Sequence, residues 1–340
     1  FLPTDVDTHT YIFLDDVLAF ASELRSAAPD AGYRQPSSDT RGTGEAAYHD
    51  MADLFGFAGE ANVFRYRCRL PGTPSNAACF AEFARRLNGF FHGEHPTRVS
   101  WYRHQPLDDS VQPARTVYTG NYAFTATALE RFIPFAPLRL RMSGPTMGRM
   151  LQAELGAAFA SANLPMLHRR TLAATGTAEF RPGVTDQQAV VDLADEFERQ
   201  FHGDVMLFAM QRLMAGGSSG GLPGRPQVAT VLETVQREMR TRYREKQRAI
   251  LARVERLESL LDDPLTWWSR EPSLAGAVAD FAAFAANMRR HFGADSPVSA
   301  RLDSSVDRAR WRARELDAIV GLDADREAWR RALALLGRHD

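Results

Sequence analysis

The distribution of apolar positions divides the chain into two parts of different character. From residue 228 to 261 neither Gly nor Pro interrupts a helical pattern, in which one face is apolar and the other is rich in Arg and Glu at i,i+4 spacing. The same spacing predicts further helices near 273–292, 306–319 and 325–337. The last part of the chain is therefore expected to be entirely helical.

This helical region is predicted to span residues 185–340. Its first helix, within 185–214, is expected to be interrupted near Gly203, and the Gly- and Ser-rich stretch 215–226 has the composition of a flexible linker. One amphipathic face serves an intramolecular contact and a homo-oligomer seam equally well. The sequence leaves self-association through the 228–261 helix open.

Residues 1–184 alternate between extended and helical patterns. Alternating or β-rich runs predict strands in 61–70, 97–104 and 114–124, with a helix in 75–91 between the first two. A second helix is predicted to begin at Pro145 and end at Gly156, followed by a buried extended segment up to residue 168. Alternation of this kind predicts an α/β domain with a mixed sheet flanked by helices.

The composition restricts the partners that can be expected. The 340 residues include 41 basic and 42 acidic side chains, a formal net charge of −1, so no global field attracts nucleic acid. No apolar run is long enough to span a bilayer. Two cysteines, Cys68 and Cys79, indicate neither a disulfide framework nor a Cys-based zinc site, so a cytoplasmic location is expected. The chain begins at Phe1 rather than Met, in what reads as the middle of a strand, which suggests an upstream segment.

Two acidic pairs near the start of the chain are candidate metal ligands. Asp5 and Asp7, in "FLPTDVDT", have the spacing with which two carboxylates hold Mg²⁺ or Mn²⁺ against a diphosphate. The alternative is a solvated turn in which Asp7 or Thr8 caps the following helix. Asp15 and Asp16 form a second pair, although helical spacing of the neighbouring leucines favours a place on a helix.

An abrupt change from apolar to basic residues marks "NLPMLHRRT". His168 is a candidate ligand of a divalent metal, and Arg169 and Arg170 are candidate ligands of a phosphate. The alternative is a hydrogen-bonded histidine at a strand edge beside two surface arginines. In "YTGNYAF", Gly120 would permit close approach of a ligand and Asn121 would bind a sugar hydroxyl, unless this stretch is a bulge or a tight turn.

The stretch "RMSGPTMGRM" opens a predicted helix whose free N–H groups would attract an anion. It lacks the lysine of a nucleotide P-loop, and an ordinary capped helix is the alternative.

In their order along the chain, these pieces resemble the GT-A fold glycosyltransferases. An acidic D-x-D is followed by a "GN" strand, a helix-opening turn and a strand that ends in His with basic residues, over residues 1–171. The resemblance implies Asp5, Asp7 and His168 as ligands of Mn²⁺ or Mg²⁺, with Asp15 and Asp16 as the alternative pair. It implies a substrate site formed by the residues Tyr118, Gly120, Asn121, Arg149, Arg169 and Arg170.

Two departures from the family pattern stand out. The stretch "SGPTMGR" carries no carboxylate where inverting members have their general base, so the catalytic residues stay unassigned. The nucleotide-binding half that normally precedes the D-x-D is also missing from this sequence.

The resulting hypothesis is a metal-dependent glycosyltransferase that moves a sugar from a nucleotide-sugar donor to an acceptor, with the catalytic domain in residues 1–184. The alternative is a non-catalytic binding or scaffold protein that associates through its long amphipathic helix.

Overall fold

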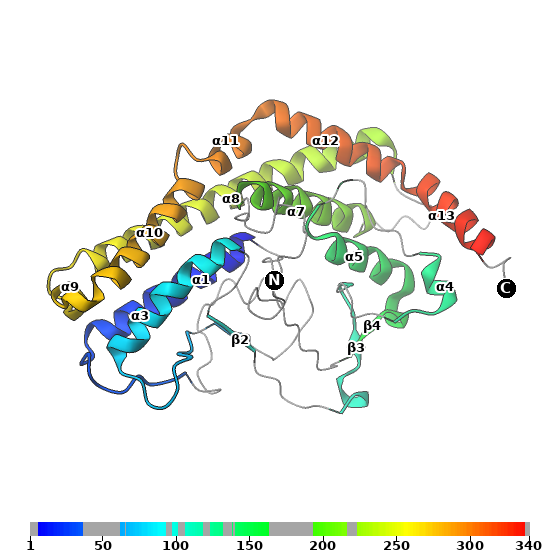
Figure 1. Cartoon of the computed structure of the whole chain (residues 1–340). Helices are drawn as coiled ribbons and strands as arrows, with labels where there is room; N and C mark the ends of the chain where they lie inside the picture. Colours follow the sequence, from blue (N-terminus) through cyan, green and yellow to red (C-terminus); the bar gives the residue numbers. More distant parts are fainter. Residues whose placement is uncertain are drawn as a thin grey trace.

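The computed structural model describes residues 6–36, 62–64, 66–92, 97–100, 106–117, 123–131, 138, 140–162, 193–215 and 223–336. These residues form a predominantly helical structure (Figure 1). Its helices are α1 (Val6–Arg25), α3 (Asn76–Leu87), α4 (Ala126–Leu129), α5 (Ser143–Leu155), α7 (Leu193–Ala215), α8 (Arg225–Leu261), α9 (Trp267–Arg270), α10 (Ala275–Phe292), α11 (Pro297–Asp303), α12 (Ser305–Val320) and α13 (Leu322–Leu336). Within this part of the chain, no helix combines the length and the apolar character needed to cross a membrane.

Helix α8 is the axis of the structure, and α1, α7, α10 and α12 pack along it (Figure 1). It begins after Gly224 with Pro226 in its first turn, where the missing N–H of proline costs no hydrogen bond. The apolar stripe read from the sequence is buried along the whole helix, as predicted, at Val228, Leu232, Val235, Met239, Ile250, Val254, Leu257 and Leu261. The long amphipathic helix therefore uses its apolar face inside its own chain.

A single hydrophobic core joins both ends of the sequence. Phe13 and Phe80, from α1 and α3, belong to the same buried cluster as Val205 of α7 and Phe281 of α10. The Phe80 ring stacks between Trp268 and Phe281, with ring centroids 5.1 and 4.8 Å away. The domain boundary predicted near residue 184 lies outside the described residues, and the core extends across it.

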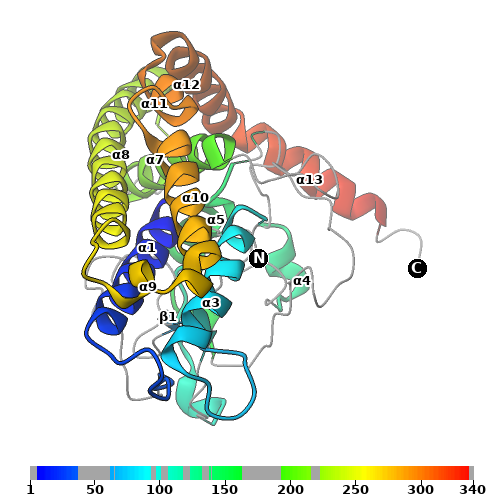
Figure 2. The same cartoon turned by 60° about the vertical axis from the view of Figure 1, so that its left-hand side comes forward.

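Helix α13 extends away from the layer formed by α7, α8 and α12 (Figure 1, Figure 2). Near its start Arg326 forms an ion pair with Glu154 of α5. One turn later, Trp329 Nε1 donates a hydrogen bond to the Leu129 carbonyl at 2.8 Å. These two contacts hold its first half against α4 and α5.

The predicted α/β domain with a mixed sheet is wrong. The strands among the described residues pair as two separate antiparallel ribbons. In one, β1 (Asn62–Phe64) pairs with β2 (Arg98–Ser100), with Val63 opposite Val99. In the other, β3 (Gln112–Pro113) pairs with β4 (Ala160–Ser161). These strands of two or three residues lie in the segments that connect the helices.

Side chains explain why the predicted strand 61–70 is so short. The Gln35 side chain accepts from the Cys68 N–H at 3.1 Å and donates to the Cys68 carbonyl at 3.0 Å. The Tyr33 hydroxyl donates to the Tyr66 carbonyl at 3.2 Å. The backbone of this extended segment thus forms its hydrogen bonds with side chains, which need no neighbouring strand.

A disulfide joins Cys68 to Cys79, with their Cα atoms 5.7 Å apart. The sequence did not indicate a disulfide, so this bond is a finding of the structure. The bond fixes the extended segment to the first turn of α3, where Cys79 is fully buried. Disulfides persist in oxidising compartments, so this pairing argues against the reducing cytoplasm expected from the sequence.

Helix α7 passes through Gly203 without the interruption expected there. The glycine is needed for packing, because a Cβ atom at this position would lie 2.3 Å from the carbonyl oxygen of Arg141. The loop before α5 therefore lies directly on the α7 backbone.

Replacement of Gly203 by alanine is expected to lower the free energy of unfolding by about 2 kcal/mol, because the backbone of Arg141 must move away. Helix propensity alone would make the alanine variant more stable than wild type. A loss of stability would therefore show that the new Cβ atom collides with the Arg141 carbonyl. Gly276 in α10 is the matched control, since a Cβ there meets no atom within 4 Å. Urea unfolding of Gly276→Ala should show no loss, and an equally neutral Gly203→Ala would contradict this packing.

Candidate functional site

Most of the residues in the sequence hypothesis lie outside the described residues. For Asp7 only the backbone is described, and it belongs to the first turn of α1 rather than to the end of a strand. The residues that lie outside the described part of the chain are Asp5, Tyr118, Gly120, Asn121, His168, Arg169 and Arg170. Their predicted roles stay predictions.

The side chains of the alternative metal pair, Asp15 and Asp16, point in different directions from α1. The two oxygens of Asp15 accept hydrogen bonds from Arg253 of α8, from Nε at 2.7 Å and from Nη2 at 3.0 Å. Asp16 points into the protein and is only 3% exposed. Consecutive helix positions point about 100° apart, so these carboxylates face different surroundings. Across the described ranges, no group of three or more His, Cys, Asp or Glu side chains is arranged to hold a metal ion.

Arg149 supports the local fold around α5. Its Nη1 donates to the Arg115 carbonyl at 2.6 Å, from a residue that is 8% exposed. Gly144 and Gly148 let the chain segment 115–117 lie against the helix, because a Cβ at Gly148 would come within 2.3 Å of the Thr116 Cα. In the structure, this face of α5 is covered by the protein's own backbone rather than open to a substrate.

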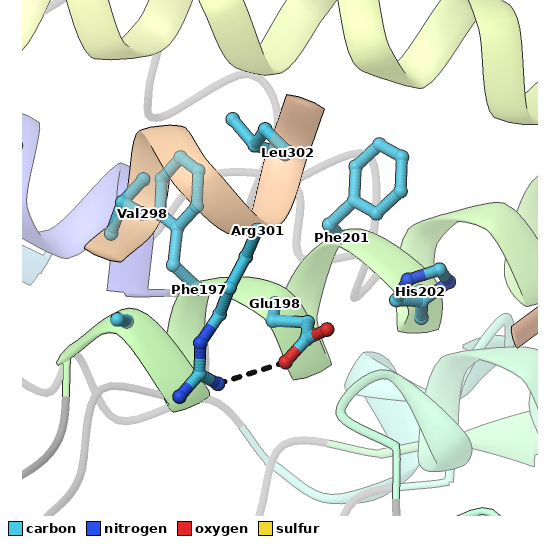
Figure 3. A pocket seen from close by; sticks show the side chains of 8 residues that line it. Phe197, Glu198, Phe201, His202, Val298, Arg301 and Leu302 are labelled. Atoms are coloured by element: carbon cyan, nitrogen blue, oxygen red, sulfur yellow. Dashed lines mark hydrogen bonds and ion pairs between the residues drawn. The ribbon is translucent and has the colours of Figure 1, made fainter. Parts of the chain in front are cut away.

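A small hollow lies between α7 and α11 (Figure 3). Phe197, Phe201, Val298 and Leu302 line its apolar part. Its interior has room for about one water molecule. At its side, Arg301 Nη1 donates to Glu198 Oε2 at 2.8 Å, and Figure 3 shows this pair reaching across from α11 to α7.

A buried His–Glu pair lies beside this hollow, where His202 of α7 also contributes to its lining. His202 Nδ1 lies 2.9 Å from Oε1 of Glu315, which belongs to α12, and both residues are at most 2% exposed. The Trp311 ring stacks on the imidazole with ring centroids 4.6 Å apart, and its Nε1 donates to Glu198 Oε1 at 3.2 Å. Four side chains of α7 and α12 thus form one interlocked polar contact.

The contact between this imidazole and this carboxylate is shielded from bulk water. Glu315 Oε2 is buried and, in the part of the chain that the structure describes, accepts no hydrogen bond. A base that acts on a substrate must reach it within hydrogen-bond distance. Here the imidazole is covered by Trp311, so the geometry favours a role in holding α12 against α7.

An arginine cluster lies on the other side of α12, where this helix meets α8 and the end of α11. We use this name for Arg240 and Arg244 of α8, which both pair with Asp303, together with Arg308 and Arg312 of α12. Asp303 accepts from Arg240 Nη2 at 3.0 Å and forms a second ion pair with Arg244. The two hydrogen bonds lower the pKa of the Asp303 carboxyl below its ordinary value.

The remaining two arginines of the cluster are on α12. Arg308 Nη1 donates to the Leu302 carbonyl at 2.7 Å. Burial, followed by the nearby charge of Arg240, lowers the pKa of the Arg308 guanidinium, and Asp303 opposes this effect. Among the described residues, neither Arg308 nor Arg312 forms an ion pair with a carboxylate. The cluster therefore carries more positive charge than its one aspartate balances.

Sequence reasoning found neither of these sites. The His–Glu pair joins residues 113 positions apart, and no local pattern relates them. The arginine cluster left a trace in "RARWRAR", where arginine occupies alternate positions from Arg308 to Arg314. The same four-residue spacing of basic side chains also occurs at Arg242/Lys246 and Arg310/Arg314, so spacing alone does not single it out.

The comparisons with known proteins add no further assignment. No protein-family model, no curated protein and no solved structure matches this chain. The function is therefore argued from the geometry of the described residues.

Proposed function

We propose that this chain is a helical binding protein that recognises an anionic partner through the arginine cluster. The observation that supports this is the excess of positive charge: Arg240 and Arg244 share one carboxylate, Asp303, and Arg308 and Arg312 form no ion pair with a carboxylate among the described residues. The surface is open, since the side chain of Arg240 is 45% and that of Asp303 53% exposed. Because the whole chain has a net charge of −1, the positive field at this place comes from the local arrangement.

Arginine suits such a role because its charge persists at all physiological pH values. Its planar N–H groups bind the oxygens of carboxylates and phosphates in pairs. Keeping several guanidinium groups together costs free energy through their mutual repulsion, and a bound anion removes that cost. Burial is the main cause of the lowered pKa of Arg308, and the charges of Arg240 and Arg312 lower it further.

This proposal develops the binding-protein alternative of the sequence analysis and changes its surface. The apolar face of α8 is buried within the chain, so recognition is assigned to the charged faces of α8 and α12. The glycosyltransferase hypothesis stays a prediction, since its donor and metal residues lie largely outside the described ranges and the sheet expected for it is replaced by helices.

The test is binding of two unlike anions, tripolyphosphate and poly-L-glutamate, measured by calorimetry at low ionic strength. The double variant Arg308→Gln/Arg312→Gln should lose at least about tenfold in affinity for any anion that binds, because charge-assisted hydrogen bonds are removed. The control Arg256→Gln/Arg290→Gln removes the same charge from exposed positions elsewhere on α8 and α10. The proposal fails if neither anion binds, or if both double variants lose affinity equally.

A further inference from the structure

We infer that the arginine cluster is the docking site for an acidic α-helix of a partner protein, whose carboxylates follow one another along one face at intervals of one helical turn. The four arginines lie in the order Arg312, Arg308, Arg240 and Arg244 along the boundary between α8 and α12. This inference rests on the proposed function, because it names the kind of anionic partner that the cluster recognises.

The two helices that carry the cluster run antiparallel. Near the start of α8, Arg225 forms an ion pair at 2.7 Å with Asp317, near the end of α12. Further along α8, the Gln236 side chain donates to the carbonyl of Arg308, near the start of α12, at 3.1 Å. As the residue number rises along α8, the number of the facing residue on α12 falls. These contacts fix the order of the arginines along the boundary.

The four arginines are evenly spaced in that order. Arg308 lies at the level of Gln236, and Arg240 and Arg244 follow one and two turns further along α8. Because α12 runs in the opposite direction, Arg312 lies one turn before Arg308. A turn of four residues rises about 6 Å, so the cluster spans about 18 Å. A ligand that engages all four arginines must therefore be extended.

Electrostatic contacts connect neighbouring members of the cluster. Arg240 and Arg244 both pair with the carboxylate of Asp303. Burial is the main cause of the lowered pKa of the Arg308 guanidinium, and the charges of Arg240 and Arg312 lower it further. The cluster is therefore a continuous positive band that contains one carboxylate.

An acidic α-helix presents carboxylates at the same interval. Glutamates four residues apart are neighbours on a helix surface, and they are separated by about 6 Å along its axis. Each could meet one guanidinium of the cluster in a charge-assisted hydrogen bond. Like charges at this spacing destabilise an isolated helix, and pairing with arginines removes that repulsion as well. Both partners thus lose an unfavourable interaction when they bind.

The aromatic residues of α8 and α12 argue against a single-stranded nucleic acid as the partner. Proteins that bind such strands stack bases on aromatic rings beside a positive surface. The aromatic residues of these two helices are Tyr243 and Trp311, which are only 1% and 9% exposed. The cluster therefore offers charge without a surface on which bases can stack. Carboxylates of a protein partner fit this arrangement better.

The test compares alanine-based peptides about 20 residues long, a length at which such helices form in water. The first peptide carries four glutamates at i, i+4, i+8 and i+12. The second has the same composition, with its glutamates spread over all faces of the helix. The third is the first peptide with a proline at its centre, which breaks the helix. Circular dichroism verifies the helicity of each peptide.

Calorimetry with the full chain at low ionic strength should show that the first peptide binds with a stoichiometry of one. We expect it to bind at least about tenfold more tightly than the second and the third, because these align fewer carboxylates with the arginines. The variants Arg240→Gln/Arg244→Gln and Arg308→Gln/Arg312→Gln should each weaken its binding at least about tenfold. The control Arg256→Gln/Arg290→Gln should leave it unchanged. Thermal melting shows whether each variant is folded.

Three results would overturn the inference while the proposed function stands, provided that binding is lost in the cluster variants. The first is equal affinity for the one-face and the spread peptide. The second is undiminished affinity for the proline peptide, which would assign the cluster to an extended segment. The third is tighter binding of an oligothymidylate than of the one-face peptide. If neither the peptides, the oligothymidylate nor poly-L-glutamate binds, the inference and the proposed function are both wrong.

Discussion

Replacement of Glu196 by alanine is expected to lower the free energy of unfolding by about 3 kcal/mol. Glu196 is fully buried and lies between two arginines. Arg141 Nε donates to its Oε2 at 2.6 Å and Arg199 Nη1 to its Oε1 at 3.0 Å. Without the carboxylate, the partly buried guanidinium groups of Arg141 and Arg199 lose their hydrogen bonds to it. Loss of one member of a buried ion pair costs far more free energy than loss of an exposed ion pair.

Glu196→Gln is the control for shape. Its amide oxygen still accepts from one arginine, so we expect a loss of roughly half the alanine effect. Urea unfolding followed by circular dichroism measures both variants. Equal stability of wild type and Glu196→Ala would show that this trio does not hold the loop before α5 to α7.

The same group gives the stability a dependence on pH. Burial raises the pKa of Glu196 above its ordinary value of 4.5, despite the opposing charges of Arg141 and Arg199. The folded chain therefore binds this proton more tightly than the unfolded chain. The stability that the protonated Glu196 contributes is fully present below the pKa that Glu196 has in the unfolded chain. It is lost as the pH rises through the higher pKa that Glu196 has in the folded chain. Over that window, wild type should lose stability with rising pH relative to Glu196→Gln, in unfolding curves recorded from pH 4 upward.

Removal of the Cys68–Cys79 disulfide is expected to have a similarly large effect, a loss of about 3 kcal/mol. The bond closes a short loop, since the two cysteines are 11 positions apart, and the unfolded chain regains the entropy of that loop when it opens. The extended segment is then held mainly by the side chains of Tyr33 and Gln35. The variant Cys68→Ala/Cys79→Ala tests this by urea unfolding.

Single variants and mass spectrometry complete the disulfide experiment. Cys79→Ala alone should destabilise about as much as the double variant, because either change removes the same bond. Alkylation of the unreduced, denatured protein should add no label, and alkylation after reduction should add two. Two labels without reduction would show that the cysteines are unpaired, and would restore the reducing setting expected from the sequence.

Local patterns predicted the helices well. Among the described residues from Leu193 onward the secondary-structure elements are helices, and the apolar stripe of α8 is buried as expected. The helix α5 ends at Gly156, whose φ of 54° is in the region that favours glycine, as the sequence indicated. Asp15 lies on a helix, which the spacing of the leucines favoured. These features depend on neighbours within one or two turns, which a sequence displays directly.

The strand predictions failed because an extended pattern does not specify which groups will form hydrogen bonds with its backbone. The segment 61–70 alternates like a strand, yet beyond Phe64 it takes hydrogen bonds from Tyr33 and Gln35 rather than from a sheet. The same limitation affects the fold class, since the runs expected to form a mixed sheet pair, within the described residues, as two short ribbons. Gly203 was read as a helix break, although its role is to admit the backbone of Arg141.

By itself, the sequence determined the positions of the helices and the faces that they bury, because periodicity and capping are local properties of the chain. Only the tertiary structure decided which side chains meet. His202 joins Glu315 across 113 positions, and Arg240 meets Asp303 and Arg308 where α8 packs on α11 and α12. Such contacts depend on how the helices cross. No spacing within a single helix encodes that geometry.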